Sequence, residues 1–226
     1  MVGDEKTLYL GVGNRTSEAA APKLARALNM DVVAVRLPSG PRSPLQNTFL
    51  HLDTVCTFVD TKTALTLPWF FDKSESGRDP LSHMLRGIAA KPKAKEQNLE
   101  SHLPVLARLG SVEVFLAGPG RKDGTVGDIK LADYLRARGY KLIYVGGEPS
   151  QSARERHAAE VVRKELRRQA SNVVAVAPGK VIAYQGNPNT AKALAAAGIE
   201  VLPFNGTELA RQNGGPHCLT QPLERG

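Results

Sequence analysis

Residues 172–204 read NVVAVAPGKVIAYQGNPNTAKALAAAGIEVLPF and contain the clearest structural pattern in the chain. Two short apolar runs flank Pro178 and Gly179, an arrangement typical of a β-hairpin. Residues 189–198 are rich in helix formers and end at Gly198, so they predict a helix with a glycine stop. Residues 199–204, IEVLPF, predict another strand. The pattern therefore indicates a hairpin followed by a helix and a strand.

The same order of elements is predicted in the first 38 residues. Residues 7–12 (TLYLGV) and 31–38 (DVVAVRLP) predict strands, and the segment between them predicts a helix. Asn14 or Ser17 is expected to cap that helix, with Pro22 in its first turn. Gly3 to Lys6 resemble a turn with almost no chain before it, which suggests that the sequence begins inside a longer protein.

A third unit is predicted between these two. Residues 49–60 and 63–70 form its hairpin, and a helix at 97–109 and a strand at 112–118 complete it. The basic segment 72–96 is expected to be a loop, and 154–168 a helix whose charges face solvent. We therefore predict a single α/β domain over residues 1–226, built from repeated hairpin–helix–strand modules.

Composition narrows the classes of function. The 226-residue chain has a net charge of +8, but the excess is scattered and no nucleic-acid-binding motif is evident. No apolar run approaches the roughly 18 to 20 residues that a membrane span needs, and the start does not resemble a signal peptide. We therefore expect a cytoplasmic protein without nucleic-acid or membrane partners. The two cysteines, Cys56 and Cys218, are too few for a disulfide framework.

Two short segments contain the candidate catalytic residues. In HLDTVCTFVD (51–60), strand alternation would place His51 and Asp53 on one face, a pairing suited to proton transfer and cation binding. An edge-strand pair of this kind is also common without any function. In NGGPHCLTQPL (213–223), two glycines and a proline present Cys218 on a tight loop, whereas Cys56 is expected in the core. The adjacent His217 is not expected to serve as its base.

Together these segments resemble the arginine deiminases, of the guanidino-group-modifying or pentein superfamily. The likeness rests on HLDTV, on the terminal Gly-Gly-x-His-Cys, and on LYLGVGNRTSEAA near the start, which resembles the family's Gly-x-x-x-Arg-Thr segment. The resemblance implies a closed five-module α/β propeller, of which this chain would supply about three modules. The ring would therefore be incomplete.

The resemblance also implies a mechanism for converting L-arginine to citrulline and ammonia. Cys218 would attack the guanidinium carbon to form a thiouronium, and His51 would protonate the leaving ammonia and later deprotonate water. Asp53 would hold the guanidinium and Arg15 the substrate carboxylate. Arg15 on the surface beside a helix is the alternative. No metal or organic cofactor is implied.

Departures from the family pattern keep other functions open. The family's Glu-Gly-Gly-Asp motif has no counterpart, so we expect the chain to be truncated at its amino terminus. Asn213 and Gly215 fall in the family's substrate-binding loop, but many members have arginine at the position of Asn213. The alternatives are a hydrolase of another guanidino compound or of arginine to ornithine, and a non-catalytic pentein module. Association into a homo-oligomer also stays open.

Overall fold

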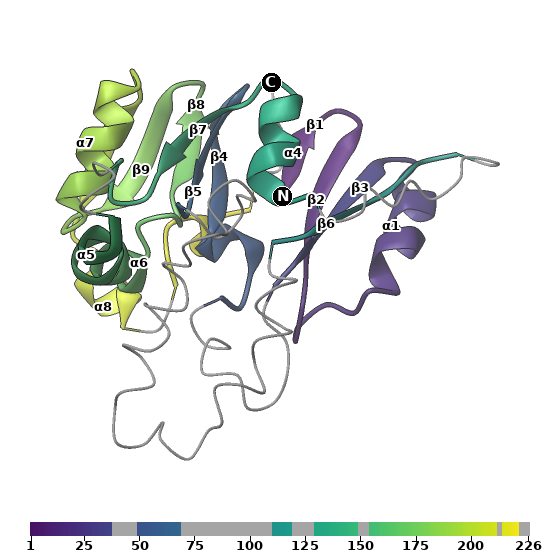
Figure 1. Ribbon diagram of the computed structural model, residues 1–226, viewed down its shortest axis with the longest axis horizontal. Coiled ribbons are helices and arrows are strands. Elements are labelled where there is room, and N and C mark those ends of the chain that lie inside the picture. Colours follow the sequence, from purple (N-terminus) through teal and green to yellow (C-terminus); the bar gives the residue numbers. More distant parts are fainter. Residues whose placement is uncertain (38–48, 69–109, 119–128, 149–153, 212–213, 222–226) are drawn as a thin grey trace, which may run out of the picture. The chain divides into compact units, whose positions relative to one another are not determined.

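The computed structural model describes residues 1–37, 49–68, 110–118, 129–148, 154–211 and 214–221 (Figure 1). The chain divides into two compact units, one made of residues 1–52 and 69–138 and the other of residues 53–68 and 139–226. Each unit combines helices with mixed sheets, as the α/β prediction expects. The predicted helix at 97–109 and the basic loop at 72–96 lie outside the described residues.

The first unit contains a four-stranded sheet in the order β1-β2-β3-β6. Strand β1 pairs antiparallel with β2, β2 parallel with β3, and β3 antiparallel with β6. Helix α1 packs on this sheet, and Ala21 and Ala25 join Val12, Val32 and Phe115 in one apolar cluster. The elements of this unit are β1 (Val2–Asp4), β2 (Thr7–Val12), α1 (Ala20–Leu28), β3 (Asp31–Arg36), β6 (Val112–Phe115) and α4 (Leu131–Ala137).

The position of strand β6 differs from the prediction for the middle module. It was expected beside the hairpin at 49–70, but it pairs with β3 in the first unit, with Val33 opposite Val114. Residues 32–35 are buried without alternation, as is typical of a strand with neighbours on both sides. An interior position for β3 therefore explains its continuous apolar run.

Two predictions about the start of the chain also need correction. Val2–Asp4 does provide a short partner strand for the turn at residues 5 and 6. The residue before α1 is Ala19, and neither Asn14 nor Ser17 caps the helix with its side chain. Instead, the Ala20 backbone N–H donates to the Ser17 carbonyl.

The second unit contains two three-stranded sheets with the same arrangement of strands. In each, a hairpin pairs antiparallel and its second strand pairs parallel with a later strand, in the orders β4-β5-β7 and β8-β9-β10. The strands are β4 (Cys56–Asp60), β5 (Thr63–Thr66), β7 (Lys141–Tyr144), β8 (Val174–Ala177), β9 (Lys180–Tyr184) and β10 (Glu200–Phe204). The parallel partner of the middle hairpin is therefore β7.

The module at 172–204 is confirmed element by element. Helix α7 (Pro188–Ala196) connects β9 to β10 and lies beside the β8–β10 sheet (Figure 1). Gly179 closes the hairpin at φ 70° and Gly198 follows the helix at φ 85°, a region that L-residues with side chains rarely adopt. Short α8 (Thr207–Ala210) follows β10.

The basic segment is helical, but one of its charges is buried. It forms α5 (Arg154–His157), a π-helical turn (Ala158–Val162) and α6 (Arg163–Arg167). Glu165 in α6 is 3% exposed, which contradicts the expectation that the charges of this helix face solvent. Its carboxylate accepts hydrogen bonds from the backbone N–H groups of Asn189 and Thr190 at 2.9 Å each. These N–H groups have no partner within helix α7, so the buried charge compensates the start of that helix.

No helix in the described ranges is both long and apolar enough to cross a bilayer.

Cys56 begins β4 and is 1% exposed, so its predicted place in the core is confirmed. Burial raises the pKa of its thiol to about 12. The thiol therefore stays protonated in the folded protein where an exposed cysteine would ionise.

Because of this raised pKa, the effect of Cys56→Ala on stability should depend on pH. At pH 7 the substitution should cost about 1 kcal/mol through a small cavity. The unfolded thiol ionises above pH ~8.5, so by pH 10 the wild-type protein loses about 2 kcal/mol of stability that the variant keeps. Urea unfolding at both pH values should show the variant less stable at pH 7 and more stable at pH 10. The same difference at both pH values would contradict this prediction.

Candidate active site

The segment around Asp53 forms a turn where a strand was expected. Residues Leu52–Thr54 form one 3-10 turn and β4 begins only at Cys56, so the predicted strand alternation of His51 and Asp53 is wrong. The reason lies in the backbone carbonyls of the turn, which bond to side chains from elsewhere. Asn172 Nδ2 donates to the Asp53 carbonyl at 3.2 Å, and Ser171 Oγ donates to the Thr54 carbonyl at 2.5 Å. Buried carbonyls need such partners when no strand supplies them.

The Asp53 side chain is 12% exposed and faces the cysteine loop. Its Oδ2 lies 3.0 Å from His217 Nδ1 and accepts a hydrogen bond from the Cys218 thiol at 3.4 Å. Its Oδ1 is buried and has no hydrogen-bond partner within the ranges that the structure describes. Asp53 is therefore a largely buried carboxylate with unused acceptor capacity beside an exposed cysteine.

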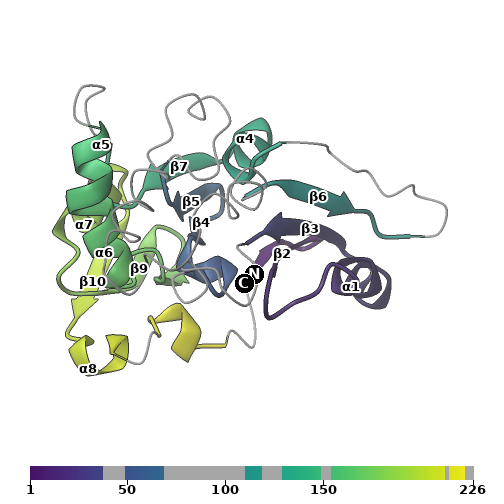
Figure 2. The ribbon, with the colours of Figure 1, turned by 60° about the horizontal axis from the view of Figure 1, so that its bottom comes forward.

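The cysteine loop spans residues 214–221 and includes a single 3-10 turn, His217–Leu219; Figure 2 shows it in yellow after α8. Asn172 Oδ1 accepts the Cys218 backbone N–H at 3.1 Å, and Asn172 Nδ2 lies 3.2 Å from the sulfur. The hydroxyl of Tyr184 donates to the Gly214 carbonyl at 2.9 Å. Hydrogen bonds therefore hold the loop at two positions, Cys218 and Gly214.

The two acidic groups respond to this environment in opposite directions. Burial raises the pKa of the Asp53 carboxyl, but the hydrogen bond and charge of His217, with hydrogen bonds from Cys218 and Asn172, outweigh it, so the pKa lies below its usual value. Burial also raises the pKa of the Cys218 thiol, and the Asp53 charge raises it further. Hydrogen bonds from the Gly215 backbone and from Asn172 lower the pKa of Cys218, without cancelling that rise. In this state Asp53 is ionised and Cys218 is a neutral thiol.

The other predicted site residues lie elsewhere. His51 and Arg15 belong to the first unit, where both are exposed. Asn213 lies outside the described residues. Gly215 is buried against Asn172: a Cβ added to Gly215 would lie 2.5 Å from the Asn172 Cβ and 2.6 Å from its Cγ. The catalytic and substrate-binding roles of these residues stay predictions.

Two residues near Cys218 were not predicted to act there. The sequence around Asn172 indicates only the start of a strand, and no local pattern singles this residue out. His217 was excluded as a base because neighbours in an extended chain diverge, yet in the 3-10 turn it reaches Asp53. A signal for this turn was present, since Pro216 fixes a φ of −55° directly before it.

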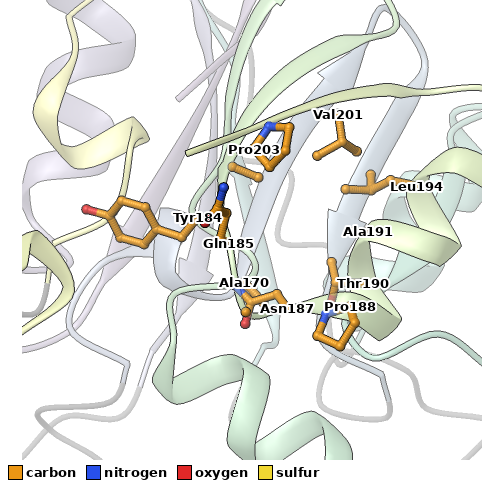
Figure 3. Close-up of a pocket in the computed structure, with 12 residues that line it drawn as sticks. Ala170, Tyr184, Gln185, Asn187, Pro188, Thr190, Ala191, Leu194, Val201 and Pro203 are labelled. Carbon is orange, nitrogen blue, oxygen red and sulfur yellow. The ribbon is translucent and has the colours of Figure 1, made fainter. Parts of the chain in front are cut away.

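A separate pocket of about 320 Å³ lies between β9, α7 and β10 (Figure 3). Leu194, Val201 and Pro203 make its lining largely apolar, and neither Asp53 nor Cys218 takes part. The ring of Tyr184 points away from the pocket in Figure 3, and its hydroxyl bonds to the cysteine loop. The described residues contain no group of three or more His, Cys, Asp or Glu side chains that could hold a metal ion.

Comparison with known proteins identifies the family. The model of the arginine deiminase family matches residues 1–225. The arginine deiminase of Mycolicibacterium gilvum is 30% identical over 216 residues, which cover 96% of this chain and 43% of the relative. That of Mycoplasma capricolum is 30% identical over 232 residues, covering 100% of this chain and 45% of the relative. The chain therefore spans less than half the length of these relatives.

Solved structures support the fold. The product-bound N-terminal domain of ArgZ, an arginine dihydrolase from the ornithine–ammonia cycle in cyanobacteria, has a TM-score of 0.52 and 17% identity, covering 97% of this chain and 52% of that chain. Unliganded ArgZ has a TM-score of 0.50 at 20% identity, covering 97% of this chain and 23% of that chain. Since the family model matches nearly the whole chain, this protein belongs to the arginine deiminase family.

Proposed function

We propose that this chain carries the nucleophile of a guanidine hydrolase that converts L-arginine to L-citrulline and ammonia. The strongest support is the hydrogen bond between Cys218 and the buried carboxylate of Asp53. The Cys218 sulfur lies 3.4 Å from Asp53 Oδ2. A guanidinium is always charged and carries planar donors that match a carboxylate. A carboxylate beside a thiol therefore suits a reaction in which sulfur attacks the guanidinium carbon.

Asp53 is the proposed guanidinium acceptor. Two parallel N–H···O bonds from a guanidinium need both carboxylate oxygens. Oδ1 has no partner among the described residues, but Oδ2 is shared by His217 and Cys218. Substrate binding would therefore replace His217 at Oδ2. His217 would keep the carboxylate satisfied until the substrate arrives.

The raised pKa of Cys218 gives the substrate a further role. The Asp53 charge disfavours a second negative charge on the adjacent sulfur. A bound guanidinium would neutralise that charge and add a positive one, so it would favour the thiolate at the moment of attack. The enzyme would then hold a reactive thiolate mainly when substrate is present.

The reaction follows in two stages. The Cys218 sulfur bonds to the guanidinium carbon, and the C–N bond to one terminal nitrogen breaks as His51 protonates the leaving ammonia. Water deprotonated by His51 then attacks the thiouronium carbon, and the C–S bond breaks to give the ureido group of citrulline. Arg15 would bind the substrate carboxylate, and Asn213 and Gly215 would form the loop beside it. This sequence of steps needs no redox cofactor.

The remaining expectations belong to the same proposal. The three sets of paired hairpin and parallel strand would be three modules of a five-module pentein propeller. The relatives are more than twice as long as this chain. The family's glutamate motif has no counterpart among these 226 residues. Cytoplasmic location is part of this proposal as well, whereas the oligomeric state is not.

Turnover by the purified chain tests the proposal directly. We expect the release of citrulline and ammonia from L-arginine, and its fall to background in Cys218→Ala, because no other described thiol is exposed. Cys56→Ala is the matched control and should retain turnover. Ornithine in place of citrulline would identify the reaction as a dihydrolase reaction. Turnover that survives Cys218→Ala would contradict the proposal, and a folded chain without any turnover would favour a non-catalytic module.

Asp53→Asn should separate the two effects of the carboxylate. The amide has nearly the same shape but no charge, so turnover should fall at least about 100-fold through loss of guanidinium binding. The pKa of the Cys218 thiol should decrease, because the charge that opposes its ionisation is gone. The pH dependence of Cys218 alkylation by iodoacetamide measures this directly. An increase of this pKa would show that the carboxylate instead promotes thiolate formation.

A further inference from the structure

The Asn172 side chain makes three hydrogen bonds beside Cys218. It is fully buried, immediately before the hairpin of β8 and β9. Its Nδ2 donates to the Asp53 carbonyl at 3.2 Å and to the Cys218 sulfur at 3.2 Å. Its Oδ1 accepts the Cys218 backbone N–H at 3.1 Å. A side-chain amide has two donor hydrogens and one acceptor oxygen, and all three functions are used here.

We propose that Asn172 is a positioning residue, which joins the Asp53 turn to the cysteine loop and donates a hydrogen bond to the Cys218 sulfur. A single rigid amide contacts both the backbone of one reacting residue and the side chain of the other. The distance between the Asp53 carboxylate and the Cys218 sulfur therefore depends on Asn172. The role of this distance in catalysis rests on the proposed function, whereas the hydrogen bond to sulfur does not.

The chemistry of the amide fits the ionised form of Cys218. A thiolate accepts hydrogen bonds, and a donor fixed beside it stabilises the charged form. A serine at this position would be too short to bridge both segments, and a leucine would leave the Cys218 N–H without its acceptor. Burial fixes the side chain further, because a buried amide without partners would be costly.

Gly215 provides independent evidence for close contact at this point. Any side chain there would collide with Asn172, since an added Cβ would lie 2.6 Å from the Asn172 Cγ. At Gly214 an added Cβ would meet only the Cys218 Cβ, at 4.0 Å, an ordinary contact. The loop therefore has a glycine where Asn172 comes closest. Gly214, which has no such contact, can serve as the control for substitutions of Gly215.

Several ionisable groups lie near the Cys218 sulfur and can affect the pKa of its thiol. Asp53 lies 3.4 Å away on the turn, and His217 contacts the same carboxylate from within the loop. Tyr184 on β9 bonds to the loop backbone through its hydroxyl, and its pKa is raised by burial and then by Cys218, so it stays neutral. Substitution of Asn172 changes none of these three side chains chemically.

The test is the pH profile of Cys218 alkylation by iodoacetamide, followed by mass spectrometry of the Cys218 peptide. Asn172→Ala should move the midpoint upward by about one pH unit, because the thiolate loses a donor. Ser171→Ala is the matched control: Ser171 is equally buried and bonds to the same turn at the Thr54 carbonyl, but it has no bond to Cys218. Its midpoint should equal that of the wild-type protein.

Cys56 reports folding in the same experiment. Because it is buried, it should resist alkylation in every folded variant. If Asn172→Ala exposes Cys56, Asn172→Leu takes its place; leucine fills the site better than alanine, offers the sulfur no donor and adds no charge, so it should also raise the midpoint. The proposal is overturned if a folded Asn172 variant keeps the wild-type midpoint, or if Ser171→Ala shifts the midpoint as far.

The glycine pair tests the same contact from the loop side. Gly215→Ala should displace the loop from Asn172, raise the midpoint and destabilise the protein by overpacking. Gly214→Ala should leave the midpoint unchanged, since neither glycine has a positive φ in the described loop. Equal midpoints in both variants would contradict the contact. None of these measurements needs a substrate, so absence of citrulline would end the proposed function without affecting the assignment of Asn172.

Discussion

The hydrogen bonds of the Asn172 side chain are the constraint on which the candidate site depends. The carbonyls of Asp53 and Thr54 bond to the side chains of Asn172 and Ser171, which lie more than 100 residues later in the chain. These bonds bring the segment before β4 together with the segment before β8. Asn172 then extends the same connection to Cys218. Without this link, the carboxylate and the thiol would belong to two separate loops.

The surroundings of Asp53 and Cys218 favour ionisation of the carboxyl over ionisation of the thiol. Asp53 and Cys218 share a hydrogen bond at 3.4 Å, so a negative charge on one opposes a negative charge on the other. His217 favours charge on Asp53, while burial and that charge keep the proton on Cys218. The donor on Asn172 acts in the other direction, and so would any cation bound at Asp53. The sulfur is therefore sensitive to whatever occupies the carboxylate.

Much of the fold was predictable from the sequence because its signals are local. The hairpin, helix and strand of 172–204 follow from Pro178, Gly179 and Gly198 together with short apolar runs. The pairing of strands between modules was harder to predict from the sequence. Strands β6 and β7 are both short, and only long-range contacts show that β6 pairs with β3 and β7 with β5. Glu165 was misread for the same reason: its partners at the start of α7 are more than 20 residues away.

The site shows the same division between local and long-range information. The loop that presents Cys218 could be found from its local sequence, and the family resemblance assigned Cys218 and Asp53 to one site, but the hydrogen bond between them was not predicted. Asn172 could not, because a buried asparagine before a strand has no local signature and its meaning comes from contacts 46 and 119 residues away. These three residues all belong to the second unit, whereas His51 and Arg15 belong to the first. The hydrogen bonds that join the Cys218 sulfur to Asn172 and to Asp53 thus come from residues of the second unit alone.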